Sequence, residues 1–87
     1  MYTIIVYDIG VERVNKVCKF LRRYLNWIQN SVFEGELTES QLREVKAQIK
    51  KRVDESIDSI WIFIVSSPKM VQKELIGIKK AETSNII

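Results

Sequence analysis

The chain has 87 residues, of which 46% are hydrophobic and 29% are charged, and its formal net charge is +3. This length and composition predict one globular domain with a modest core, and the mild positive charge permits an anionic partner without requiring one. The chain contains no histidine. This excludes histidine as a general base and as part of a Ser-His or Cys-His pair, so any hydrolysis would need carboxylates and a hard metal ion.

The sequence favours a cytoplasmic protein without a membrane span. The longest apolar run, residues 60–65, is far too short to cross a bilayer. The N-terminus lacks the basic and apolar regions of an export signal. The single cysteine, Cys18, lies at an apolar helical position and is most simply a small core residue rather than part of a disulfide framework.

The first strand, predicted over residues 2–9, organises the rest of the chain. Its β-branched and aromatic residues form a nearly continuous run, which is typical of a central strand covered on both faces. Asp8 ends this run, and Gly10 separates it from a helical pattern. A carboxylate at this place either caps the following helix or belongs to a functional site.

The first helix is predicted over residues 11–25. Its apolar stripe consists of Val14, Val17, Cys18, Leu21 and Leu25. The opposite face carries five cations, which form either an ordinary solvated surface or a phosphate-binding face beside Asp8. These cations are Arg13, Lys16, Lys19, Arg22 and Arg23.

A second strand is predicted over residues 27–33, and residues 34–36 either end it or form a short additional strand. Thr38 and Gln41 fit a capping box, so a second helix is expected to begin at this point. Its apolar stripe is Leu42, Val45, Ile49 and Val53.

A wholly apolar strand follows at residues 60–65, and Pro68 lies just beyond it. A weaker strand is predicted over residues 74–78, and residues 79–87 form a tail. Two helices of this length cover only one face of such a sheet. Because both strong strands are apolar on both faces, the pattern predicts that a second copy of the sheet covers the open face in a two-fold dimer.

Several segments in this order resemble the small adaptation proteins of the second CRISPR-associated (Cas) family. The most specific segment is Gln29-Asn30-Ser31-Val32-Phe33-Glu34-Gly35 within residues 29–38, and the resemblance covers nearly the whole chain. The other matching segments are Tyr7-Asp8-Ile9, Arg13-Val14-Asn15-Lys16-Val17 and Asp58-Ser59-Ile60.

The resemblance implies an α+β, ferredoxin-like single domain over residues 1–78, with two helices on one face of a four- to five-stranded sheet. It further implies a homodimer with facing sheets, in which the last strand joins the partner's sheet. By resemblance, Asp8 binds Mg²⁺ or Mn²⁺ and is catalytic together with Tyr7. Lys16 matches a phosphate-facing position, and Phe33 matches an aromatic position linked to nucleic acid.

The family relationship also implies metal-dependent cleavage of DNA or single-stranded RNA and a complex with the CRISPR integrase during spacer acquisition. Two roles therefore stay open. The chain is either a metal-dependent endonuclease or a non-catalytic adaptor whose basic helix face holds DNA. A ferredoxin-like regulatory dimer is the remaining alternative.

Overall fold

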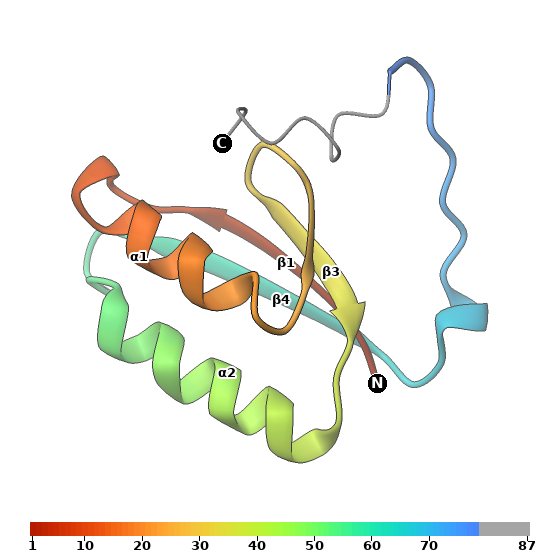
Figure 1. Ribbon diagram of the computed structural model, residues 1–87, viewed down its shortest axis with the longest axis horizontal. Helices are drawn as coiled ribbons and strands as arrows, with labels where there is room; N and C mark the ends of the chain where they lie inside the picture. Colours follow the sequence, from red (N-terminus) through yellow and green to blue (C-terminus); the bar gives the residue numbers. More distant parts are fainter. Residues whose placement is uncertain (79–87) are drawn as a thin grey trace.

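In the computed structural model, which describes residues 1–78, two helices cover one face of a four-stranded sheet (Figure 1). The strands lie in the order β2-β3-β1-β4 and all neighbouring pairs are antiparallel. This βαββαβ arrangement is the ferredoxin-like one, so the predicted fold class is confirmed. The elements are β1 (Tyr2–Asp8), α1 (Val11–Leu21), β2 (Asn26–Gln29), β3 (Val32–Glu36), α2 (Glu39–Arg52), β4 (Ser59–Val65) and a short 3-10 helix, η1 (Pro68–Met70).

The two helices begin as predicted, but α1 ends earlier. The Thr38 hydroxyl accepts a hydrogen bond from the Gln41 backbone N–H at 3.1 Å, and the Gln41 side chain accepts one from the Thr38 N–H at 3.0 Å. The predicted capping box of α2 is therefore confirmed. Helix α1 ends at Leu21, and a turn then returns Leu25 to the core. Neither helix within residues 1–78 has the length and apolarity needed to cross a membrane.

The second strand predicted over residues 27–33 is instead a hairpin. Strands β2 and β3 pair with each other, and Asn30 lies in the turn between them with φ of 46°. Asparagine is among the few residues other than glycine that adopt this left-handed conformation readily. Asn30 and Ser31, which lie within the predicted strand, are therefore turn residues. The additional strand suggested for residues 34–36 belongs to β3.

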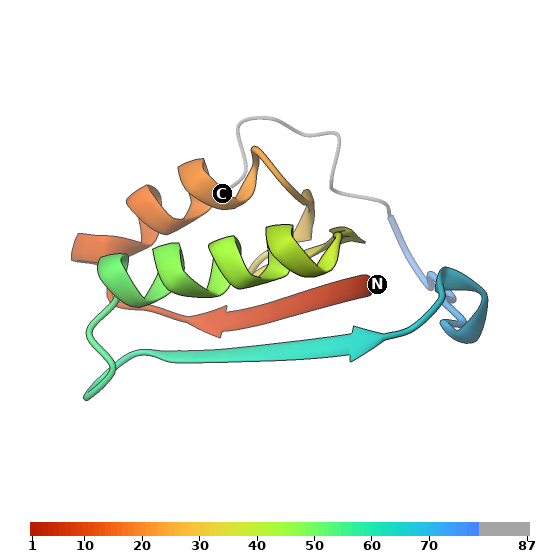
Figure 2. The ribbon, with the colours of Figure 1, turned by 90° about the horizontal axis from the view of Figure 1, so that it is seen from below.

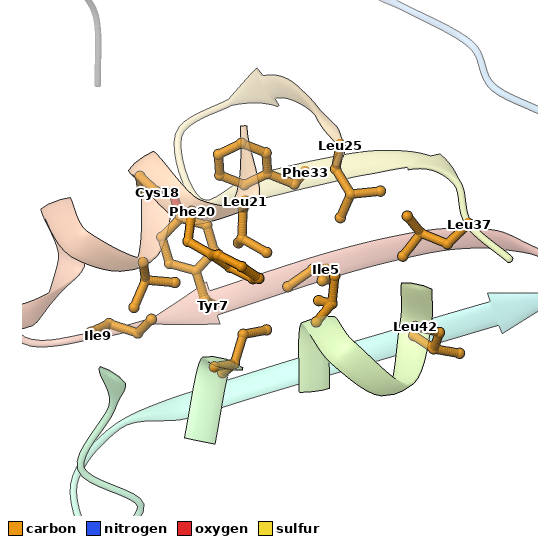
Figure 3. Packing of buried hydrophobic residues seen from close by; sticks show 13 residues of the cluster. Ile5, Tyr7, Ile9, Cys18, Phe20, Leu21, Leu25, Phe33, Leu37 and Leu42 are labelled. Atoms are coloured by element: carbon orange, nitrogen blue, oxygen red, sulfur yellow. Dashed lines mark hydrogen bonds between the residues drawn. The ribbon is translucent and has the colours of Figure 1, made fainter. Parts of the chain in front are cut away.

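The core lies between the helices and the sheet (Figure 3). Alternate residues of β1 face the helices, where Thr3, Ile5 and Tyr7 are buried. Phe33 from β3 and Leu21 from α1 are among the most completely buried side chains. Figure 2 shows both helices on the same side of the sheet, so one layer of side chains provides almost the whole core.

The other face of the sheet is open in a single chain. Trp61 and Phe63 from β4 remain 64% and 51% exposed, with their rings stacked at a centroid distance of 6.3 Å. Together with Val6 of β1 they line a shallow hollow of about 430 Å³. The prediction of strands covered on both faces thus holds for the helix side only, and we call the uncovered side the open face.

The segment after η1 forms no strand within the part of the chain that the structure describes. Residues 71–78 have no ladder partner, so the strand predicted over 74–78 does not form in a single chain. Lys73 nevertheless forms an ion pair with the buried Glu34 of β3, and its pKa is raised by that carboxylate. The predicted tail, residues 79–87, lies outside the described residues.

Candidate functional site

Asp8 is the last residue of β1, and its side chain is exposed on the open face. Strand alternation places it on the same face as Val6, whose cross-strand neighbour in β4 is Trp61. Ser59 lies directly opposite Asp8 across the β1–β4 ladder. A carboxylate therefore lies at the margin of an exposed apolar surface, where it remains accessible to water and to cations.

Tyr7 points to the opposite face and does not share a site with Asp8. It is buried beneath α1, with its hydroxyl 3.1 Å from the Cys18 sulfur and donating to the Asn30 carbonyl at 3.3 Å. Burial and the adjacent thiol raise the pKa of the Tyr7 hydroxyl far above its usual value. Tyr7 and Asp8 lie on opposite faces of β1, because adjacent strand residues face opposite ways, and the catalytic role predicted for Tyr7 stays a prediction.

The loop after Asp8 is held by Asp58, at the start of β4. The Asp58 carboxylate accepts two hydrogen bonds from the Arg13 guanidinium, at 2.6 and 2.8 Å, and its side chain is only 1% exposed. It also accepts from the backbone N–H groups of Gly10, at 3.0 Å, and Asp54, at 2.8 Å. One carboxylate thus joins the β1–α1 loop, the first turn of α1 and the α2–β4 turn.

Gly10 lies close to two of the charged side chains at this loop. A Cβ at this position would meet the ends of the Arg13 and Glu12 side chains, which would have to shift to accommodate it. The hydrogen bonds from Arg13 and from the two backbone amides hold the pKa of the Asp58 carboxyl well below its usual value. The sequence indicated Asp58 only as part of a segment that resembles the family, and its role in holding the loop was missed. The one local sign of such a role is that an acidic residue lies directly before an apolar strand.

The lowered pKa of Asp58 predicts a dependence of stability on pH. A carboxyl with a folded-state pKa below its unfolded value stabilises the fold above the unfolded pKa, near 4, and this stabilisation is lost as the pH falls further. In thermal melts, the wild-type Tm should therefore fall on acidification below about pH 4 more steeply than the Tm of Asp58→Asn. Parallel pH profiles of the two proteins would contradict this role.

The cations predicted to bind nucleic acid differ in their availability. Lys16 and Lys19 are exposed on α1, and Arg22 and Arg23 are exposed in the turn directly after it. Arg13 is instead paired with Asp58 and Glu12, so its guanidinium is already engaged in holding the β1–α1 loop. Phe33 is fully buried in the core, and the prediction that it contacts nucleic acid is corrected because no face of its ring reaches the surface.

The residues at Asp8 suit a hard divalent ion but do not complete a site in one chain. Magnesium prefers carboxylate oxygens and retains several waters, so one or two carboxylates suffice when substrate phosphates also bind. Within residues 1–78 there is no group of three or more acidic, cysteine or histidine side chains that could bind a metal ion. Asp8 therefore offers one carboxylate of the fitting type.

Residues 1–73 match the family described as CRISPR associated protein Cas2. The chain is 53% identical to "CRISPR-associated endoribonuclease Cas2" of Methanosarcina acetivorans and 52% identical to the protein of the same name from Pyrococcus furiosus, and each comparison covers both proteins completely. A solved structure described as "Crystal structure of cas2" is similar, with 46% identity, a TM-score of 0.85, and coverage of 100% of this chain and 98% of the other. Streptococcus pyogenes Cas2 has 28% identity and a TM-score of 0.78, with coverage of 88% and 100%.

Proposed function

We propose that this chain, which belongs to the CRISPR-associated protein Cas2 family, acts as a homodimer that binds nucleic acid, cleaves it with a divalent metal ion at Asp8, and serves the CRISPR integrase in spacer acquisition. The observation that carries the proposal is the position of Asp8 at the margin of an exposed apolar sheet face. A second copy that covers this face brings a second Asp8 toward the first.

The open face supports the homodimer. Trp61 and Phe63 present a stacked aromatic surface beside Val6, and such contiguous exposed patches mark interaction sites. A two-fold interface is self-complementary, so each copy would bury the same aromatic residues against the other. Burial of large aromatic side chains is the main source of binding energy in interfaces of this kind.

The outer edge of β4 supports the addition of a partner strand. Within residues 1–78 no strand pairs with this edge, which leaves a long apolar strand open to further pairing. Residues 74–78 expose Leu75, Ile76 and Ile78. Beside the same edge, a groove of about 300 Å³ between α2 and β4 has Ile49, Val53, Ile60 and Ile62 in its lining. A strand added to β4 would direct alternate side chains over this groove and over the open face.

The proposed chemistry rests on hard oxygen ligands. When bound, a magnesium or manganese ion would polarise a phosphoryl oxygen and activate a water molecule. Asp8 of each copy would hold the ion. The aromatic residues beside Asp8 would exclude bulk water from the surrounding interface, which strengthens the electrostatic interaction between the carboxylates and the cation.

The exposed cations of α1 and of the turn after it would contact phosphates without reading the bases. Lys16, Lys19, Arg22 and Arg23 occur twice in a dimer and so offer two symmetric basic surfaces to a duplex. The integrase would then meet nucleic acid already held by the dimer. A pure binding role is the second candidate, because one chain supplies a single carboxylate at the proposed metal site.

Cleavage by the wild-type protein separates these two candidates. We expect hydrolysis of single-stranded RNA or DNA in the presence of Mg²⁺ or Mn²⁺ and none in the presence of chelator, because no histidine is available as a metal-free base. Binding without cleavage under all metal conditions would favour the adaptor. Retention of the integrase by the tagged wild-type protein, but not by an unrelated protein of similar charge, would test the proposed partnership.

A further inference from the structure

Besides the groove beside β4, a groove whose charged lining residues are all basic lies between the two helices. It has a volume of about 230 Å³ and is lined by Lys16, Lys19, Phe20, Arg23 and Arg52. Lys16 and Lys19 come from α1, Arg23 lies in the turn directly after it, and Arg52 is the last residue of α2. Lys16 and Lys19 are three residues apart, so they lie on the same side of α1. Together with Arg23 they line the same groove as Arg52.

Arg52 is held in place before any ligand arrives. Its guanidinium lies 4.7 Å from the centroid of the Phe20 ring, a cation–π contact. Its Nη1 atom donates to the Gln48 carbonyl at 3.0 Å and to the Gln48 side-chain oxygen at 2.5 Å. Neither hydrogen bond uses Nε or Nη2, which lie on the other edge of the guanidinium. A planar donor pair fixed in this way suits bidentate binding to a phosphate.

The charge of this groove differs from that of the groove beside β4. Among the described residues, the lining of the inter-helix groove includes four cations and no acid. The groove beside β4 has Lys46 and Lys50 in its lining, but also Glu55 and Asp58. Converging cations without an acid focus a positive potential and attract an anion.

We propose that the groove between α1 and α2 anchors the phosphate backbone of a nucleic acid, with Arg52 as a phosphate ligand beside Lys16, Lys19 and Arg23. This rests on the proposed nucleic-acid binding and adds a site that is separate from Asp8. The helices lie on one side of the sheet (Figure 2). Strand alternation places Asp8 on the other face, together with Val6. Nucleic acid held in the groove is therefore anchored away from the proposed metal centre.

The test compares Arg52→Ala with Lys51→Ala, which removes the same charge from the neighbouring exposed position of α2. Affinity for a random-sequence DNA duplex is measured by fluorescence anisotropy in chelator across a salt series. Arg52→Ala should weaken binding roughly tenfold at low salt, the loss expected for one charged hydrogen-bonded contact. The slope of log affinity against log salt should flatten by about one unit. Lys51→Ala should change the affinity by less than about twofold, as expected for an exposed charge outside the site.

Arg52→Lys retains the charge but loses the planar donor pair, so its affinity should fall between those of the wild type and Arg52→Ala. Equal losses in Arg52→Ala and Lys51→Ala, with both variants folded by circular dichroism, would overturn the groove site. Inorganic phosphate that binds the wild type, but not Arg52→Ala, while duplex affinity stays equal in both proteins, would identify a free-anion site instead and also overturn it. A wild-type protein that binds no duplex would refute the proposed nucleic-acid function as well.

Discussion

Replacing Trp61 and Phe63 together by glutamate is expected to convert the proposed dimer into a monomer. Both side chains lie on the open face and remain largely exposed in the single chain, so the change should harm the interface more than the fold. Loss of two aromatic anchors worth about 2 kcal/mol each raises the dissociation constant about a thousandfold. Two carboxylates introduced beside Asp8 would add like-charge repulsion across the two-fold axis. Light scattering after size exclusion measures the result.

The matched control introduces the same charges elsewhere. Val11 and Ile57 are exposed apolar residues outside the open face, 82% and 69% exposed. The double variant Val11→Glu and Ile57→Glu should remain dimeric. A Trp61→Glu and Phe63→Glu protein that keeps the wild-type mass at micromolar concentration would show that the open face is not the interface.

Removal of the chain from Lys73 onward tests the contribution of the last segment to the same dimer. The truncation takes away residues 74–78, which we propose to pair with β4 of the partner, and it leaves that edge open. We expect a monomer or aggregated protein. Because Lys73 also pairs with the buried Glu34, the full-length Lys73→Ala protein is the control. A soluble dimer after truncation would mean that the segment is not exchanged.

Local patterns predicted most of the fold. The capping residues of α2 and the apolar run of β1 each specify a structure through neighbouring residues, and both were confirmed. The β2–β3 hairpin was missed because its turn has no glycine. The hairpin is seen in the structure from the pairing of β2 with β3 and from the left-handed conformation of Asn30. Strand β1 was predicted to be covered on both faces because its apolar run is nearly continuous. Such a run does not indicate whether the second face is covered by the same chain or by another one.

The sites were harder to predict because they depend on contacts distant in sequence. Asp8 could be predicted as accessible, since it ends a strand before a glycine. The pairing of Arg13 with Asp58 joins residues 45 positions apart, and no local pattern indicates it. From the sequence alone, Arg52 is one of several cations on the outer, solvated face of α2. Its role in the basic groove becomes visible only when α1 packs beside α2 and supplies Phe20.

Asp8→Asn is expected to reduce metal-dependent cleavage at least about a hundredfold, while the dimer and the fold stay intact. The substitution retains the shape of the side chain but replaces a carboxylate, the ligand type that magnesium prefers, by a neutral amide. Because one carboxylate per copy is available at the proposed site, its loss removes both carboxylate ligands of a dimer at once. Cleavage rates at saturating Mg²⁺, with light scattering of the same samples, measure the effect.

Tyr7→Phe is the matched control, since it alters the neighbouring residue on the opposite face of β1. Loss of the hydroxyl contacts to Cys18 and Asn30 should cost about 1 kcal/mol of the free energy of unfolding. Cleavage by the folded protein should stay near the wild-type rate, because the hydroxyl points into the core and not toward Asp8. Equal loss of cleavage in both variants would show that Tyr7 acts together with Asp8. The Tyr7 side chain would then have to leave the core in the active dimer. Cleavage that persists in Asp8→Asn and in chelator would place the activity outside this metal site.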